Sequence, residues 1–187
     1  MVRSRLALVI FGVLWVTRAD AQPTPVAGVL TGQLGVVFGG ETEKTGITPS
    51  GAIAILESNG LGAEIDLGHT FSIADEDAFE DSRVTTLTLN FLASRPEGRV
   101  RPFGTVGLGL IRLRARRADV EQAVLRTDWG ADFGGGALLM LNDISAVRVD
   151  VRYFRYLDQH GDLLLSDGDP FDFWRLSFGV TWGWPIK

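Results

Sequence analysis

Apolar and polar residues alternate along most of this chain with a period of two. In the stretch VRVDVRYFRYL (147–157), valine or tyrosine occupies every odd position from 147 to 153, whereas Arg148, Asp150 and Arg152 occupy even positions. Such alternation predicts β-strands with two unlike faces, and helical periodicity is nearly absent. The pattern predicts eight strands, at approximately residues 28–40, 50–57, 60–71, 83–94, 100–113, 127–141, 144–156 and 172–184.

The connections between these strands alternate in length. Three of them, SNG (58–60), RPEG (95–98) and ND (142–143), have the composition of tight turns. The others are long and polar and cover residues 41–49, 72–82, 114–126 and 158–171, and residues 118–125 in the third of these are a candidate short helix. The long loops then share one end of an up-and-down sheet, as in outer-membrane barrels, which have short periplasmic turns and long outer loops. We therefore expect an all-β fold, an eight-stranded antiparallel up-and-down transmembrane β-barrel.

The side chains on the two phases predict which face meets lipid. In the last strand (173–184), aromatic residues flank an aliphatic middle on one phase, whereas the other phase is mainly Gly, Ser and Thr and includes Arg175. This arrangement is typical of a lipid-facing strand with aromatic girdles at both membrane interfaces. The expected girdle residues are Trp129, Tyr153, Trp174, Phe178, Trp182 and Trp184.

Two non-membrane folds remain as alternatives. A soluble β-sandwich would expose its polar phase to water and should be rich in Lys and Glu there, but after residue 21 the only lysines are Lys44 and Lys187, outside the expected strands. A lipocalin-type barrel would turn its apolar phase inward around a ligand. That orientation would bury Trp182 and Trp184 and leave a glycine-rich outer wall. Both folds fit the sequence less well than a membrane barrel does.

Several charged residues lie on the polar phase of the expected strands. An arginine that faces lipid near the membrane midplane costs about 2–4 kcal/mol, so these residues are expected to point into the barrel. The expected lumen charge network consists of Glu64, Asp66, Asp132, Arg148, Asp150, Arg152 and Arg175. It either fills the narrow lumen as a set of buried ion pairs or lines a small conduit. At this strand number, the first alternative is favoured.

The N-terminal segment differs from the rest of the chain. Arg3 and Arg5 precede an 11-residue apolar run (6–16), and Ala19-Asp20-Ala21 follows it, which predicts a secretory signal peptide over residues 1–21. Residues 22–187 then form one β-barrel domain with 15 basic and 22 acidic residues, a net charge of −7 that argues against nucleic acid as a partner. The chain has no cysteine, which excludes thiol catalysis and cysteine-ligated metals.

Four stretches resemble the OmpA-like outer-membrane β-barrel superfamily, the small eight-stranded barrels of Gram-negative bacteria. They are TTLTLNF (85–91), RPFGTVGLGLIR (101–112), TDWGADFGGGALLMLNDISAVRVDVRYF (127–154) and FWRLSFGVTW (173–182). The resemblance implies a monomeric barrel domain in the cell outer membrane, in contact with its lipids and lipopolysaccharide. It also implies that the closing strand addresses the assembly machinery, although residues 185–187 follow Trp184, where many members end on an aromatic residue.

The outer rim carries the remaining binding candidates. Arg112, Arg114, Arg116 and Arg117 either contact lipopolysaccharide phosphates or form a solvated rim. Acidic residues gather in segments 75–81 and 167–172, but neither segment has the spacing of an EF-hand. We therefore expect no metal site and no cofactor.

The two histidines are the candidate bases for catalysis. His69 lies on the lipid phase near Ser72, and His160 lies six residues before Ser166. Neither spacing matches a lipid A deacylase motif, so we expect no catalytic residue. The expected function is structural or surface-interacting, through membrane integrity, adhesion or lipopolysaccharide contact. A narrow channel for small solutes is the alternative, and a lipid A-modifying enzyme comes third.

Overall fold

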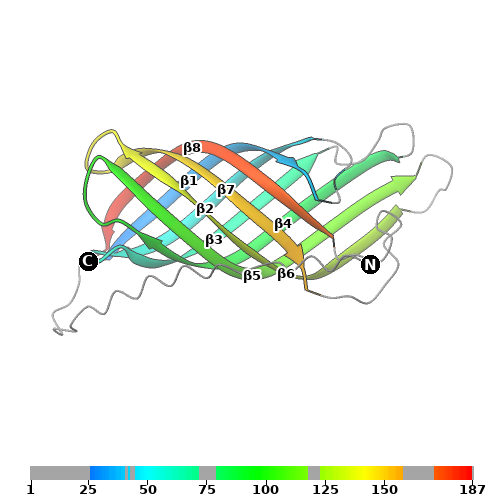
Figure 1. The fold of residues 1–187 in the computed structure, drawn as a ribbon, viewed down its shortest axis with the longest axis horizontal. Helices are drawn as coiled ribbons and strands as arrows, with labels where there is room; N and C mark the ends of the chain where they lie inside the picture. The colour runs from blue at the N-terminus through cyan, green and yellow to red at the C-terminus, as the bar shows by residue number, and fades with distance from the viewer. Residues whose placement is uncertain are drawn as a thin grey trace, which may run out of the picture.

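The computed structural model describes residues 26–40, 42, 45–71, 79–117, 123–157 and 171–186, and the expected signal peptide lies outside this part of the chain. Eight strands account for most of the described residues (Figure 1). They are β1 (Val26–Phe38), β2 (Gly46–Glu57), β3 (Leu61–Phe71), β4 (Phe79–Ser94), β5 (Val100–Arg117), β6 (Ala123–Met140), β7 (Ser145–Tyr156) and β8 (Asp172–Ile186). No helix long and apolar enough to cross a membrane occurs in the described ranges.

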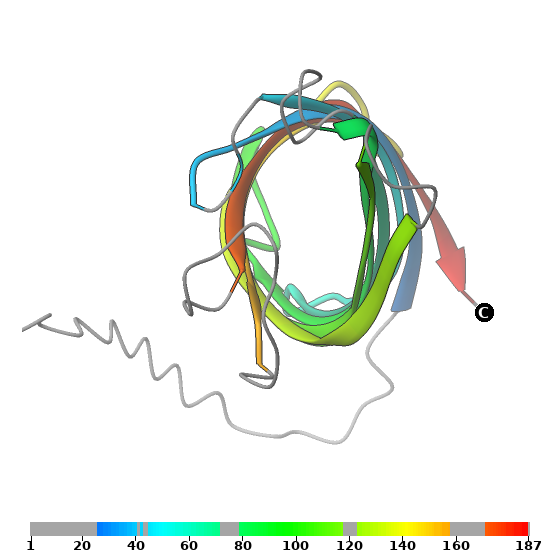
Figure 2. The same cartoon turned by 90° about the vertical axis from the view of Figure 1, so that its right-hand side faces the viewer.

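The strands form one closed antiparallel barrel. Each strand pairs with its neighbours in sequence, and β1 pairs with β8, with Val26 opposite Ile186 and Phe38 opposite Trp174. Figure 2, which looks along the barrel, shows the closed ring. Closure pairs the backbone N–H and C=O groups between strands, as a sheet surrounded by lipid requires. The predicted fold class and strand order are confirmed.

Tight turns gather at one end of the barrel, next to the C-terminal end of β8 (Figure 1). Gly60 and Gly98 adopt positive φ angles of 88° and 102° in two of these turns, a conformation that glycine adopts without steric cost. A side chain at position 60 would also collide with the chain, because its Cβ would lie 2.0 Å from the carbonyl oxygen of Ser94. We call this the turn end and the opposite end the loop end.

Several strands extend further toward the loop end than the sequence predicted. β2 begins at Gly46 and β4 at Phe79, inside the predicted loops 41–49 and 72–82. The candidate helix over 118–125 is wrong for residues 123–125, which belong to β6; residues 118–122 lie outside the described part of the chain. The reason is that antiparallel pairing with β5 continues to Arg116 opposite Ala123, whereas a single helical turn is marginal on its own.

Burial alternates along the strands and places the polar phase inside. In β7, Arg148, Asp150 and Arg152 are buried, and in β8 Trp174 and Phe178 are exposed on the outer surface. This assignment excludes the lipocalin and sandwich arrangements. At the loop end, however, the interior is apolar, and its buried cluster consists of Val37, Val84, Ile111, Leu113, Phe154, Tyr156, Phe171 and Phe173.

Candidate functional site

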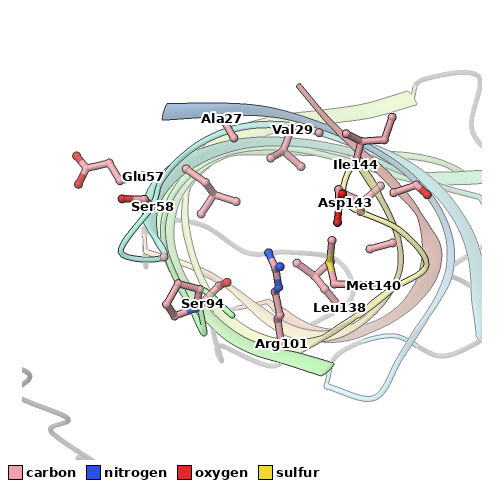
Figure 3. Close-up of a pocket in the computed structure, with 17 residues that line it drawn as sticks. Ala27, Val29, Glu57, Ser58, Ser94, Arg101, Leu138, Met140, Asp143 and Ile144 are labelled. Carbon is pink, nitrogen blue, oxygen red and sulfur yellow. The ribbon is translucent and has the colours of Figure 1, made fainter. Parts of the chain in front are cut away.

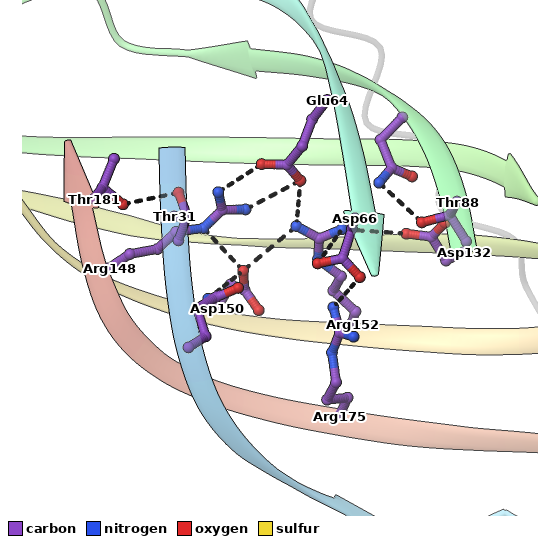
Figure 4. A network of polar contacts seen from close by, with 12 residues as sticks. Thr31, Glu64, Asp66, Thr88, Asp132, Arg148, Asp150, Arg152, Arg175 and Thr181 are labelled. Atoms are coloured by element: carbon purple, nitrogen blue, oxygen red, sulfur yellow. Dashed lines mark hydrogen bonds and ion pairs between the residues drawn. The ribbon is translucent and has the colours of Figure 1, made fainter. Parts of the chain in front are cut away.

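Arg148 anchors one side of a charge network in the middle of the lumen (Figure 4). Its Nη1 donates to Oε2 of Glu64 at 2.6 Å and its Nη2 to Oε1 at 3.3 Å, so the two groups form a bidentate pair between β7 and β3. Its Nε donates to Oδ2 of Asp150 at 3.0 Å. All three side chains are buried, because alternation along β3 and β7 turns them away from lipid.

Arg152 is the centre of the network and is fully buried. Its Nη2 donates to Oε1 of Glu64 at 2.5 Å and lies 3.5 Å from Oδ2 of Asp150. Its Nη1 lies 3.9 Å from Oδ2 of Asp66 and 3.8 Å from Oδ2 of Asp132. One guanidinium group therefore connects four carboxylates from β3, β6 and β7 (Figure 4).

Arg175 and two aromatic rings complete the network. Nη2 of Arg175 donates to Oδ1 of Asp66 at 2.8 Å, and its guanidinium carbon lies 4.9 Å from the centre of the Phe154 ring. At the other end of the network, the guanidinium carbon of Arg148 lies 4.5 Å from the centre of the Phe103 ring. The seven residues predicted as the lumen network thus lie together, with four carboxylates facing three guanidinium groups.

The apolar cluster at the loop end is a feature that the sequence analysis missed. Phe154 and Phe173 stack with their ring centres 5.0 Å apart, and the hydroxyl of Tyr156 donates to the carbonyl oxygen of Ile111 at 3.2 Å. Phe154 and Phe173 both lie on the polar phase of their strands, and this position could have indicated from the sequence that they point into the lumen. The lumen is therefore filled by charged side chains in its middle and by aromatic side chains between these and the loop end.

The outer surface at the loop end carries two cross-strand rows of residues on β3, β4, β5 and β6. The lower row consists of His69, Thr85, Arg112 and Thr127, in register. The upper row consists of Phe71, Arg83, Arg114 and Leu125. Directly beneath both lies an apolar row of Leu67, Leu87, Leu110 and Trp129. We call the lower and upper rows together, without the apolar row, the rim patch.

Of the four arginines predicted at the rim, two lie in this patch and have side chains that the structure describes. Arg112 and Arg114 are exposed on the outer face of β5, whereas Arg116 and Arg117 belong to β5 by their backbone and their side chains lie outside the described part. Arg83, which the sequence analysis did not select, lies opposite Arg114. Its position on the outer phase of the predicted strand 83–94 was the signal that could have revealed it.

The predicted girdle residues all face outward, but at three heights. Tyr153 and Trp174 contact each other near the loop end, with ring centres 5.1 Å apart, and Trp129 lies in the apolar row next to the rim patch. Trp182 and Trp184 lie toward the turn end. Phe178 lies between these two belts, because it pairs with Leu34 and Val149 in mid-strand.

The histidine and acidic candidates give no assembled site among the described residues. Nδ1 of His69 lies 2.8 Å from the Thr85 hydroxyl oxygen, and its ring meets the edge of Phe71. Ser72, His160 and Ser166 lie outside the described residues. Within those residues, no group of three or more His, Asp or Glu side chains has the geometry to hold a metal ion.

Comparisons with known proteins agree with this architecture. A family model described as the outer membrane protein beta-barrel domain matches residues 6–183. Neisserial surface protein A superposes with a TM-score of 0.62 at 13% identity, covering 84% of this chain and 96% of that chain. The N-terminal β-barrel domain of Pseudomonas aeruginosa OprF superposes with a TM-score of 0.61 at 11% identity, covering 84% and 97%.

A third structure adds a bound ligand in a protein of the same fold. Ail, the attachment invasion locus protein of Yersinia pestis, in complex with the heparin analogue sucrose octasulfate, superposes with a TM-score of 0.57 at 12% identity, covering 86% of this chain and 99% of that chain. No curated protein sequence matches this chain. The family match extends over nearly the whole sequence and agrees with the closed eight-stranded barrel. This chain is an outer-membrane protein and belongs to the outer membrane protein β-barrel domain family.

Proposed function

We propose that this barrel is a structural, surface-interacting protein of the outer membrane that binds lipopolysaccharide phosphates through its rim patch. The observation that carries the proposal is the register of the patch, which sets Arg112 directly above the apolar row that ends at Trp129 and places Arg83 opposite Arg114 in the next row. Tryptophan is enriched where hydrocarbon meets the headgroup region. Arg112 and Arg114 are therefore at the height where lipid phosphates lie.

The chemistry of the patch suits a phosphate group. Arg112 lies between Thr85 and Thr127 in the lower row, so a guanidinium group and two hydroxyl groups face the same side of the sheet. Arginine binds phosphate through charge-assisted, bidentate hydrogen bonds, and hydroxyl groups can add further donors. Arg114 extends the cationic surface by one row toward the loop end.

An apolar groove beneath the patch fits the acyl part of the same lipid. It is lined on β3 to β6 by Ile65, Leu87, Leu89, Val106, Leu108, Trp129 and Ala131 among others. Ala131 follows Trp129 on the outward phase of β6, and the small side chain beside the large ring contributes to the hollow. Cations above an apolar groove complement an acylated, phosphorylated lipid.

The interior supports a structural role over a channel. The ion pairs of Arg148 and Arg152 cross the lumen, and the aromatic cluster lies between them and the loop end. Such a filled interior stiffens the barrel and opposes the passage of solutes. Within this proposal the closed barrel acts as a monomer, residues 1–21 direct export, and the aromatic phase of β8 addresses the assembly machinery.

The test compares two double variants with the same change of charge. Arg112→Gln with Arg114→Gln removes two rim charges, whereas Arg95→Gln with Arg99→Gln removes two exposed charges at the turn end. Each protein is incorporated into nanodiscs, and its binding of purified lipopolysaccharide is titrated alongside lipopolysaccharide without its lipid A phosphates. Slower migration after boiling in SDS confirms that each variant is folded.

We expect the rim variant to bind lipopolysaccharide about tenfold or more weakly, because each lost charge-assisted hydrogen bond contributes about 1.5–3 kcal/mol. The turn-end variant should bind like the native protein, and dephosphorylated lipopolysaccharide should not distinguish the rim variant from the native protein. The proposal is contradicted if both double variants lose the same affinity for lipopolysaccharide. It is also contradicted if the native protein binds dephosphorylated lipopolysaccharide as tightly as the phosphorylated form. The polyanion in the Ail structure is compatible with it, since sulfate groups present similar oxygens.

A further inference from the structure

The lumen has a pocket at the turn end, separate from the charge network and the rim patch (Figure 3). Its volume is about 210 Å³, and it opens between the tight turns. Its walls are mainly apolar and include Ala27, Val29, Leu56, Leu138 and Met140. A pocket with these walls removes an aliphatic group from water, which is favourable in proportion to the area covered.

Arg101 is the cation of this pocket. Figure 3 shows its side chain reaching from β5 toward the middle of the opening, beside Leu138 and Met140. Its Nε donates to the carbonyl oxygen of Gly98 at 3.1 Å, which fixes the base of the guanidinium group. Among the described residues, Arg101 forms no ion pair, although Glu57 and Asp143 also line the pocket.

Side chains that are buried and contact one another lie further into the lumen than the pocket. Phe103, two residues further along β5, stacks on the guanidinium group of Arg148, whose charge is taken up by Glu64 and Asp150. On β1 and β8, across the barrel from β5, the hydroxyl oxygens of Thr31 and Thr181 lie 3.1 Å apart. We therefore expect a ligand to enter and leave the pocket at the turn end, where turn residues such as Gly60, Pro96 and Asp143 line it.

We propose that this pocket binds a small aliphatic carboxylate, with the carboxylate on Arg101 and the short apolar chain against Leu138 and Met140. The guanidinium group of Arg101, which has no ion pair among the described residues, attracts an anion, and its bidentate geometry favours a carboxylate. The volume of the pocket restricts the ligand to a small molecule, because it is below the roughly 300–1,000 Å³ of pockets that bind drug-sized ligands. Short tight turns face the periplasm in these barrels, so the ligand comes from that compartment.

The sequence provides a specific probe for the pocket. The chain has two methionines, Met1 and Met140, so labelling the methionine methyl groups with ¹³C places one NMR probe on the pocket wall. The protein in lipid nanodiscs is titrated with hexanoate, hexylammonium and acetate. A Met140→Leu variant assigns the signal. Hexylammonium reports partition of an amphiphile into lipid, and acetate reports the carboxylate without the chain.

We expect hexanoate to shift the Met140 signal saturably, with little effect of hexylammonium or acetate. Arg101→Gln should weaken hexanoate binding by about tenfold or more, because a charge-assisted contact is lost. Arg99→Gln, an exposed arginine of the adjacent turn, should leave binding unchanged. Asp143→Asn should strengthen binding, because it removes an acidic group from the pocket lining.

Three results would overturn this proposal: equal shifts with hexanoate and hexylammonium, unchanged binding in Arg101→Gln, or weaker binding in Asp143→Asn. Each variant is first checked for slower migration after boiling, which separates loss of the ligand from loss of the fold. The outcome is independent of the rim patch, since lipopolysaccharide binds at the loop end. Failure of one proposal therefore leaves the other to be judged by its own experiment.

Discussion

Replacing Arg152 with methionine should destabilise the barrel by about 3–5 kcal/mol, the usual cost of breaking a buried ion pair by removing one partner. Methionine keeps much of the apolar volume of the side chain, so the change tests the charge. A domain is typically stable by only about 5–15 kcal/mol, and the expected loss is a large part of that.

The structure identifies which carboxylate loses most. After the substitution Glu64 keeps Arg148 at 2.6 Å, and Asp66 keeps Arg175 at 2.8 Å. Asp150 keeps Arg148 at 3.0 Å. Asp132 is different, because the contact at 3.8 Å to Arg152 is its only ion pair among the described residues. The expected cost is therefore that of one buried carboxylate, Asp132, left without an ion pair.

The assay follows urea unfolding of the refolded barrel in lipid vesicles by tryptophan fluorescence, with mobility of unboiled samples as the second probe. Arg152→Met combined with Asp132→Asn should be clearly more stable than Arg152→Met alone, because it removes the unpaired charge. Arg99→Met at the exposed turn should change stability by less than about 0.5 kcal/mol. A loss below about 1 kcal/mol for Arg152→Met, or a double variant no better than the single one, would refute the reasoning.

Two further predictions concern the barrel wall. Gly136→Ala should cost about 1–3 kcal/mol by urea unfolding, because its Cβ would lie 2.0 Å from the carbonyl oxygen of Val149, whereas Gly32→Ala, with no atom within 4 Å, should cost much less. Equal costs would show that the wall relaxes around the added methyl group. Phe178→Arg should cost about 2–4 kcal/mol in the same assay and Trp184→Arg only about 0–1 kcal/mol, because Phe178 lies in mid-strand and Trp184 near the turn end. The opposite order would mean that the barrel sits at a different height in the membrane.

The sequence predicted most of the fold because the governing pattern is local. Alternation in 147–157 assigned Val149 to lipid and Arg148 to the lumen, and the structure exposes the first and buries the second. The ends of the strands were less predictable. Residues 123–125 were assigned to a candidate helix, but they form strand because β5 continues beside them, and that pairing is not encoded within the segment itself.

Strand phase determined which charged residues point inward, but it could not determine which of them meet. Glu64 and Arg148 are separated by 84 positions in the chain, and their 2.6 Å contact depends on how the register of every intervening strand adds up around the barrel. The rim patch depends on the same quantity, since Arg83 and Arg114 become neighbours only through the pairing of β4 with β5.

The sequence by itself therefore determined an exported, cysteine-free membrane barrel with its polar phase inside. The reason is that the period of two, and the side-chain types on each phase, can be recognised within each strand separately. Only the tertiary structure decided the layers of the lumen: an aromatic cluster at the loop end, ion pairs in the middle and a pocket around Arg101 at the turn end. The physical reason is that closure fixes the height of each side chain relative to residues on distant strands, and contact inside a barrel is decided by height as much as by phase.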